Sequence, residues 1–405
     1  MSTSLLYHGF GIRGYYHDST KFESGTIVFN IKHDELKLRC PDCKSREFKK
    51  RGTKNRTFKA QPVGKREVFI NLPIQRIECL CCQKIHQVKL DFADTMRTFT
   101  NGFERYALDL CRLMPISDVA DLLNVSWGTI KDIDKRYLKK KYDKPKLKAL
   151  KRMAIDEIYL GRKMKYITLV MDLETGAVVY VGEGKGSQSL SEFWKKIRRA
   201  KANIEAVATD MGPAYIKAVN DNLPGVPIVL DHFHVIKLYN EKLSDLRRDL
   251  QRDAEAEQKN VLKGTRWLLL KSSKNLDSDG DEGEKLRKAL ELNEPLAMAY
   301  YLKDDLGQVW KQDDKQEADF LLLKWIQKAA SSSGVTMLKK FAKLLSKYTN
   351  EILAYYDFNK MSSGRMEGTN NKIKTLQKRA YGYRDMEYFK LKIKSLHESK
   401  YAILR

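Results

Sequence analysis

The chain has 405 residues, which is enough for two or three domains, and 42% of them are hydrophobic, which is enough to build a sizeable core. Lys and Arg (76) outnumber Asp and Glu (52), and the net charge of +24 favours a polyanionic partner, either nucleic acid or an anionic membrane surface, over a basic surface that serves solubility alone. The longest apolar runs, such as residues 167–171, are far shorter than the roughly 20 residues that span a bilayer, and the first residues lack the pattern of a signal peptide. These features argue against a membrane-spanning class and predict a cytoplasmic protein.

Five of the six cysteines fall between residues 40 and 82. They form two CxxC pairs on either side of a basic, strand-like stretch, which is the pattern of a zinc ribbon. In so small a domain, metal binding supplies folding energy that the apolar core cannot. We therefore predict a zinc-binding domain over residues 1–95, with the ribbon at 40–86 and with four ligands: Cys40, Cys43, Cys79 and Cys82.

Two further side chains compete for the same role. Cys81 could exchange with Cys82 as a ligand, and His86 is a weaker candidate. The alternative interpretation is a set of reduced core cysteines or a redox pair.

Residues 96–140 have the pattern of a helix-turn-helix DNA-binding domain. Ser126 is a good N-cap for a second helix that starts at Trp127. The first helix turns four apolar residues inward: Val119, Ala120, Leu122 and Leu123. The second helix presents four residues outward, as a recognition helix in a major groove would: Thr129, Lys131, Asp132 and Lys135. The alternative is an ordinary helical hairpin.

A basic linker over residues 141–152 precedes a region of alternating strands and helices at 153–237. The expected order is three strands, a helix, a strand, a helix and a last strand over residues 226–237. This order is typical of an RNase H-like α/β core. Residues 238–358 are polar and helical, and we expect them to be an all-helical insertion into that core.

Residues 359–405 are expected to form the second part of the core, a Gly/Ser loop followed by a basic helix that carries Glu367. Four side chains of this helix are predicted to follow DNA phosphates: Lys372, Lys374, Lys378 and Arg379. Tyr381 and Tyr383 could stack on an unpaired base or pack in the core.

Several acids interrupt apolar strands, where an unpaired carboxylate is costly. Asp156 and Asp210 do so, and Asp210 is followed closely by a glycine at a strand end, where open α/β sheets bind ligands. Converging carboxylates are the ligands that Mg²⁺ prefers, and phosphodiester chemistry uses two such ions. Asp172 and Asp231 interrupt strands in the same way, so periodicity alone does not select the set.

Four segments together resemble the bacterial insertion-sequence transposases of the ISL-three family. They are Asp156-Glu157, Ala208-Thr209-Asp210-Met211, Asp231-His232-Phe233-His234 and the block from Gly364 to Lys374. With the cysteine pairs and the helix-turn-helix, the resemblance covers nearly the whole chain in the right order. It departs from the family pattern at Gly364-Arg365-Met366, where a Gly-Pro-like approach is more frequent.

The resemblance implies a DDE transposase with a multidomain α+β fold: a zinc ribbon, a helix-turn-helix and an RNase H-like core with its helical insertion. Asp156, Asp210 and Glu367 would then bind two Mg²⁺ or Mn²⁺ ions, and the four predicted cysteines would bind zinc. Asp231, His232 and His234 are candidates to stand behind these ligands. His232 and His234 alternate on a strand, so both could face the active site and contact phosphates; the alternative is that one packs in the core and the other meets solvent.

The activity implied is binding of terminal inverted repeats, hydrolysis at the element end and attack of the freed 3′-OH on target DNA. Pairing two ends implies a homodimer or a larger synaptic assembly, near the nucleoid of a bacterial cytoplasm. Two alternatives remain: a site-specific DNA-binding regulator that has lost catalysis, and an RNase H-like nuclease that cuts without joining.

Overall fold

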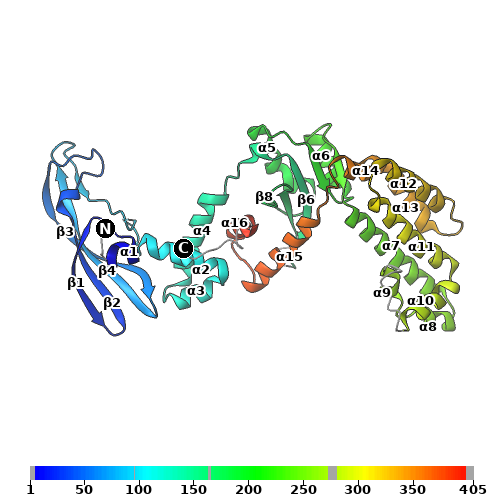
Figure 1. Cartoon of the computed structure of the whole chain (residues 1–405), viewed down its shortest axis with the longest axis horizontal. Helices are drawn as coiled ribbons and strands as arrows, with labels where there is room; N and C mark the ends of the chain where they lie inside the picture. The colour runs from blue at the N-terminus through cyan, green and yellow to red at the C-terminus, as the bar shows by residue number, and fades with distance from the viewer. Residues whose placement is uncertain (1–4, 95, 163–165, 272–280, 398–405) are drawn as a thin grey trace. The chain divides into compact units, whose positions relative to one another are not determined.

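The computed structural model describes residues 5–94, 96–162, 166–271 and 281–397. The chain divides into two units. The first contains the residues up to Asp143 together with the chain from Gln377 onward, and the second contains Lys144–Leu376. Figure 1 shows the elements of both, which are described separately below.

A five-stranded sheet forms the N-terminal part of the first unit, after the short helix α1 (Leu5–Phe10). The strands are β1 (Tyr15–Glu23), β2 (Thr26–His33), β3 (Phe48–Val63), β4 (Arg66–Cys79) and β5 (Ile85–Gln87). Their order is β1-β2-β4-β3, with β5 paired to β4. Every second residue of β4 from Val68 to Ile74 is buried, so one face of this part of the β3–β4 hairpin faces the core. The β1–β2 hairpin, which extends this sheet, was not identified from the sequence.

Three helices follow: α2 (Asn101–Leu113), α3 (Ile116–Leu122) and α4 (Trp127–Tyr142). The Ser126 hydroxyl accepts a hydrogen bond from the Thr129 N–H (3.1 Å), which confirms Ser126 as the N-cap of α4. Val119, Ala120 and Leu123 are buried as predicted. The prediction for Leu122 is wrong: it is 59% exposed, because α3 ends at this residue and the chain turns away.

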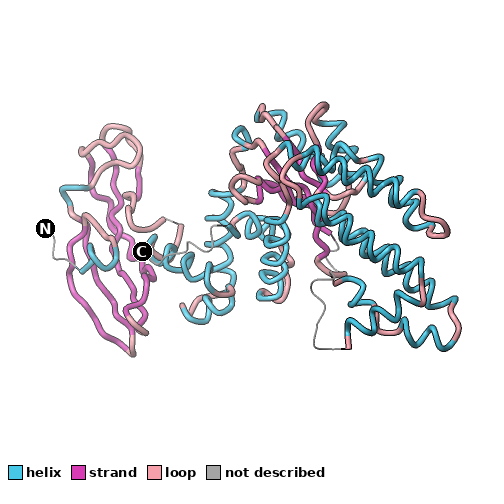
Figure 2. Tube along the Cα trace, turned by 45° about the vertical axis from the view of Figure 1, so that its right-hand side comes forward, coloured by secondary structure: helices cyan, strands magenta, loops and turns pink. Residues whose placement is uncertain are grey.

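The second unit contains a sheet with the order β10-β9-β6-β7-β8. Its strands are β6 (Arg152–Tyr159), β7 (Tyr166–Asp172), β8 (Val178–Glu183), β9 (Ala206–Thr209) and β10 (Ile228–Leu230). Strands β6, β7 and β8 are antiparallel neighbours. Strand β9 pairs parallel with β6, and β10 pairs parallel with β9. The connecting helices are α5 (Ser191–Ala200) and α6 (Pro213–Asn222). This is the strand order of an RNase H-like core, and Figure 2 shows these strands enclosed by helices.

The strand predicted over residues 226–237 is mostly a helix. Only Ile228–Leu230 is a strand, and helix α7 (His232–Asp253) begins two residues later. Asp231 is its N-cap, and the carboxylate accepts a hydrogen bond from the Phe233 N–H (3.1 Å). Val235, Tyr239 and Leu243 are buried at four-residue spacing, so a helical period places these apolar residues on one face where a strand would not.

Further helices of the second unit lie within residues 238–358, the range that the sequence predicted to be a helical insertion: α8 (Ala256–Leu262), α9 (Arg266–Leu270), α10 (Glu282–Glu291), α11 (Glu294–Gln308), α12 (Lys315–Ala330), α13 (Thr336–Lys347) and α14 (Thr349–Asp357). Tyr239, Trp325 and Phe341 pack edge to face at its centre, with ring centroids 5.0–6.0 Å apart. No helix among the described residues is long and apolar enough to cross a membrane.

The last two helices are α15 (Gly364–Arg379) and α16 (Met386–Lys394). The sequence assigned all of residues 359–405 to the core, but the structure divides the segment at residue 376. The reason is the apolar face of α16, which packs Tyr388 and Leu391 against Leu138 of α4. The C-terminal helix therefore completes the helical bundle of the first unit.

Candidate active site

Asp156 lies in β6, and Asp210 follows the last residue of β9, the parallel neighbour of β6 in the second sheet. The register of β6 and β9 pairs Met153 with Val207 and Ala154 with Ala208. The pairing ends there, two residues before each acid, and the Asp210 charge acts on the Asp156 carboxyl. The two acids that the sequence singled out therefore lie in the same region, where β9 ends beside β6.

The Asp156 carboxylate is held in a half-buried position. Its Oδ1 accepts a hydrogen bond from the Glu157 N–H (2.8 Å), and its Oδ2 accepts one from the Asn370 amide (2.7 Å). Burial raises the pKa of Asp156, and the negative charge of Asp210 raises it further, while Asn370, Glu157 and His234 act in the opposite direction. The acid is thus poised where a neighbouring cation would stabilise its charged form.

Asp210 follows the last residue of β9 in a tight turn. Its Oδ1 accepts a hydrogen bond from the Gly212 N–H (2.9 Å), and a Cβ on Gly212 would lie 2.7 Å from that oxygen. A larger residue at position 212 would therefore displace the Asp210 carboxylate from this hydrogen bond, and Pro213 starts α6 directly afterwards.

Glu367 lies in the first turn of α15 and is exposed. Asn370, which bonds to Asp156, is three residues further on, and side chains at this spacing are neighbours on a helix. In the part of the chain that the structure describes, the Glu367 carboxylate makes no hydrogen bond with either aspartate. Among the described residues, the three acids do not bring one oxygen each within 4.8 Å, whereas four cysteines do bring their sulfurs that close. The structure thus delivers the helix of Glu367 to Asp156 through Asn370, a residue to which the sequence assigned no role.

Asp231 ties the start of α15 to the end of β10. Its Oδ2 accepts hydrogen bonds from the Ser363 N–H (3.1 Å) and from the Ser363 hydroxyl. Burial alone raises the pKa of Asp231, but the approach of His232 and the bonds from Ser363 and Phe233 outweigh it and lower the pKa to about 2. Asp231 is therefore an ionised anchor for α15 rather than an acid facing the open edge of the sheet.

A second anchor holds α15 to the β7–β8 hairpin. The Arg365 guanidinium donates to the backbone oxygens of Leu173 (2.8 Å) and Glu174 (3.1 Å). Asp172 closes the same turn, because it accepts hydrogen bonds from the Glu174 N–H (3.0 Å) and the Thr175 hydroxyl (2.6 Å). The carboxylate of Asp172 is thus used within its own turn.

His232 and His234 were expected to share one face of a strand. They lie instead in the first turn of helix α7. Side chains two positions apart on a helix point about 200° away from each other, so the two histidines face nearly opposite sides. His234 contributes to the field at Asp156. His232 packs near Trp310 and Tyr355 of the helical insertion, at 6.1 and 5.8 Å between ring centroids. Only His234 is therefore on the side of the candidate active site.

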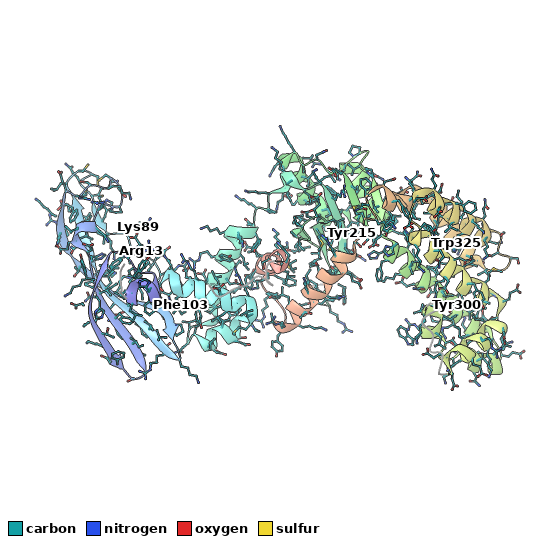
Figure 3. All side chains as sticks on the ribbon, viewed as in Figure 1. Arg13, Lys89, Phe103, Tyr215, Tyr300 and Trp325 are labelled. Atoms are coloured by element: carbon teal, nitrogen blue, oxygen red, sulfur yellow. The ribbon has the colours of Figure 1, made fainter. Side chains whose placement is uncertain are left out.

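A buried polar network supports the opposite side of β6. The Tyr215 hydroxyl (Figure 3) donates to Glu157 (3.0 Å), accepts from the Gly186 N–H (3.0 Å) and contacts the Thr168 hydroxyl (3.0 Å). Ser189 in turn donates to Thr168 (2.7 Å). Since Glu157 adjoins Asp156 in β6, this network fixes the strand that presents Asp156.

The four predicted cysteines form a second site, in the first unit. The Sγ atoms of Cys40 and Cys82 are 3.6 Å apart, those of Cys43 and Cys79 are 3.4 Å apart, and all four lie within 4.8 Å of one another. Four sulfurs at about 2.3 Å from one zinc lie about 3.8 Å apart, so the cluster fits a tetrahedral zinc ion.

The surroundings of the cluster decide between the other candidates. Lys44 and Gln83, each just after the second cysteine of a pair, have left-handed φ values of 62° and 55°, so both pairs make the same turn. Cys81 is exposed and outside the cluster. His86 Nε2 lies 3.8 Å from Cys82 Sγ and 3.5 Å from an Asp42 oxygen, so it stands behind a ligand instead of completing the set.

The residues expected to contact DNA from α4 are not all free. Lys131 and Lys135 were expected to face outward, but each lies 3.0 Å from Asp385 at the start of α16, and Lys135 is also 2.7 Å from Glu387. The hydroxyl of Thr129 lies 2.9 Å from that of Ser126, within the cap. Trp127 is an exposed large hydrophobic side chain on this helix (53%), and the sequence did not select it as a contact.

The basic residues of α15 divide in a similar way. Lys372, Lys374 and Lys378 are exposed. Arg379 donates to the Leu113 backbone oxygen (2.5 Å) and so caps the end of α2. Three of the four predicted phosphate contacts are therefore available on the surface of this helix.

Three family models match the chain, and together they cover most of it. The model described as "Transposase" matches residues 153–393, and the "helix-turn-helix domain of transposase family ISL3" matches residues 88–138. The "zinc-finger of transposase IS204/IS1001/IS1096/IS1165" matches residues 37–82.

Individual proteins are similar over nearly the same length. The chain is 29% identical over 376 residues to the transposase for insertion sequence element IS1001 of Bordetella parapertussis, with 91% of each protein covered. It is 25% identical over 379 residues to the transposase for IS1557 of Mycobacterium tuberculosis, covering 85% of this chain and 82% of that protein. Among solved structures, the Drosophila P element transposase strand transfer complex matches with a TM-score of 0.41 and 12% identity, over 76% of this chain and 93% of that one.

Proposed function

This chain belongs to the ISL3 family of insertion-sequence transposases, and on that premise we propose that it cuts and joins DNA by a DDE mechanism with Asp156, Asp210 and Glu367 as the metal-binding carboxylates. The observation that carries the proposal is the convergence of three chain segments. Asp156 lies in β6, Asp210 follows the end of the parallel neighbour β9, and Asn370, on the helix of Glu367, donates a hydrogen bond to Asp156; these positions support the proposal.

The donor set fits Mg²⁺ or Mn²⁺. Carboxylate oxygens are hard ligands, and the described residues include no Lys or Arg ion pair with any of the three acids. A bound cation would therefore relieve the repulsion between the negative charges of Asp156 and Asp210. Two ions bound there would stabilise the attacking and the leaving oxygens of the phosphodiester.

The protein's own residues position this chemistry. Asn370 orients Asp156, the Gly212 N–H orients Asp210, and Asp231 with Ser363 fixes the start of α15. The exposed Lys372, Lys374 and Lys378 on the same helix neutralise DNA phosphates, which gives affinity without sequence preference.

End recognition is assigned to the first unit. The zinc-binding domain (1–95) and the helix-turn-helix (96–140) would read the terminal inverted repeats, with the exposed first turn of α4 entering the major groove. Because two ends must be paired, we propose a homodimer or a larger assembly on DNA. Light scattering with and without end DNA would test this, and a complex containing one chain per two ends would contradict it.

The test of the triad is metal-dependent cleavage and joining of labelled element ends in the presence of a target plasmid. Asp210→Asn should lose both reactions, by at least about 100-fold, while end binding persists. Asp172→Asn is a matched control, because Asp172 and Asp210 each accept a backbone N–H two residues on, at 3.0 and 2.9 Å. The control variant should cut and join as the wild type does.

Each other outcome has a definite meaning. Equal activity of Asp210→Asn and wild type would remove Asp210 from the catalytic set. Cut ends without joined product would identify a nuclease, and tight end binding without cutting by the wild type would identify a regulator.

A further inference from the structure

Tyr381 ends helix α15 in a backbone conformation that is unusual for its residue type. Its φ is +50°, in the left-handed region. The Tyr381 N–H donates to the Lys378 oxygen (3.1 Å) and the Gly382 N–H donates to the Gln377 oxygen (2.9 Å). These two bonds form a Schellman motif, in which the position of Tyr381 is usually a glycine because a Cβ is disfavoured there. Helix termination therefore does not explain the tyrosine.

Packing does not explain it either. The side chain of Tyr381 is fully exposed, and it makes no ring, cation or hydrogen-bond contact among the residues that the structure describes. Tyr383, two residues later, is its opposite: its ring stacks on Phe389 with centroids 4.5 Å apart and planes at 24°. The sequence could not separate the two tyrosines, whereas the structure assigns Tyr383 to the core and leaves Tyr381 without a structural role.

The surroundings of Tyr381 are basic. Lys378 precedes it by three residues and Arg384 follows it by three, and both are exposed and have no acidic partner within the described chain. Lys374 lies one further turn back along α15. An exposed aromatic ring between cations that bind phosphates is the arrangement that single-stranded and unstacked DNA recognises, because each base has a π face and each nucleotide a phosphate.

We propose that Tyr381 stacks on an unstacked or unpaired base of the element-end DNA. This inference rests on the proposed function, since it takes the DNA held along α15 as its ligand.

Replacing Tyr381 by glycine should relieve the left-handed backbone and so stabilise the fold, but it should weaken DNA binding because the ring is lost. The two effects have opposite signs, so loss of binding cannot be caused by misfolding. Tyr381→Gly should keep or raise the melting temperature and weaken end binding by about 5- to 100-fold. Tyr381→Phe and Tyr381→Trp should bind within about twofold of wild type, since stacking needs the ring and not the hydroxyl. Phe320→Ala removes another exposed ring, on α12, and should leave binding unchanged.

Two further measurements separate stacking from charge and locate the base. Tyr381→Gly should leave the salt dependence of binding unaltered, whereas Lys378→Ala should reduce the slope of log affinity against log salt by about 0.9. With 2-aminopurine placed singly at successive positions of the element end, wild type should change the fluorescence at one position and Tyr381→Gly should not.

Tyr381→Gly that binds as tightly as wild type, with the same fluorescence change, would overturn the proposal. Equal weakening of Tyr381→Phe would also overturn it, because the hydroxyl and not the ring would then be responsible. Asp210→Asn should retain the fluorescence change, so a loss of cleavage there and a loss of stacking at Tyr381 remain distinguishable. Wild type that binds no end DNA would instead refute the proposed function.

Discussion

At the scale of single residues, Asn370 is the side chain that joins the two halves of the candidate active site. Its amide donates to Asp156 (2.7 Å), while its own Oδ1 is buried without a partner in the described structure. Residues that orient metal ligands are typically worth about 10- to 100-fold in metal affinity or activity. Asn370→Ala should therefore lower cleavage by about that factor and weaken Mn²⁺ binding measured by titration calorimetry.

The adjacent Asn371 is the control for this prediction. It is exposed, so Asn371→Ala should cut normally and bind Mn²⁺ with unchanged affinity. Normal Mn²⁺ affinity in Asn370→Ala would show that the amide does not prepare Asp156 for metal.

Asp231 carries a prediction about pH at the same scale. Its pKa is lowered to about 2 in the folded chain, against about 3.9 for an unperturbed aspartate. A depressed folded-state pKa stabilises the fold above pH 4, and that stability is lost as the pH falls from about 4 to 2. Asp231→Asn should cost roughly 2 kcal/mol at pH 7, and the difference from wild type should shrink to about half near pH 3.

Denaturant unfolding of both proteins at several pH values would measure this difference. Asp172→Asn provides the comparison, since Asp172 lies in an exposed turn. A difference between wild type and Asp231→Asn that stays constant from pH 7 to pH 3 would contradict the assignment of Asp231 as an ionised anchor.

At the scale of elements, the docking of α16 on α4 depends on a buried ion pair. Asp134 is 3% exposed, and its carboxylate accepts hydrogen bonds from the Tyr388 hydroxyl and from Lys392 (3.0 Å). Removing one partner of a buried pair leaves an uncompensated charge, at a cost of about 3–5 kcal/mol. Lys392→Met should therefore destabilise the helical bundle strongly and lower its melting temperature.

The same two helices offer a matched exposed pair. Lys139 and Glu387 are 2.7 Å apart with side chains about half exposed, and such pairs contribute about 0–1 kcal/mol. Lys139→Met should thus be nearly neutral. Similar melting temperatures for the two variants would mean that α16 is not held by the buried pair.

At the scale of the whole molecule, the two units should respond separately to loss of zinc. The small ribbon depends on its metal for folding energy, whereas the second unit has its own core. Chelation should unfold the ribbon and abolish end binding, but leave a calorimetric transition from the second unit. Cys82→Ser should lose zinc in metal analysis, and Cys81→Ser, at an exposed position outside the cluster, should keep it. Loss of zinc from both would return Cys81 to the ligand set.

Local signals in the sequence determined much of this protein. The spacing of two cysteine pairs predicted a cluster that the structure confirms, because the geometry of a CxxC turn involves only adjacent residues. Ser126 identified the start of α4, and alternating apolar runs identified the strands of the core. In each case the interactions that form the element involve residues close together in the chain, so the sequence pattern predicts the observed structure. The same pattern failed at residues 231–237, where the cap made by Asp231 starts a helix on an apolar run.

Only the tertiary structure decided which groups meet. Asp156, Asp172, Asp210 and Asp231 look alike along the chain. Hydrogen bonds use Asp172 in a turn and Asp231 as an anchor, whereas the pairing of β6 with β9 brings the segments of Asp156 and Asp210 together. Likewise the contact of Asn370 with Asp156 joins residues 214 positions apart, and that of Lys392 with Asp134 joins residues 258 apart. Such contacts depend on how whole elements pack, because burial and strand pairing act over distances in space that have no counterpart in sequence spacing.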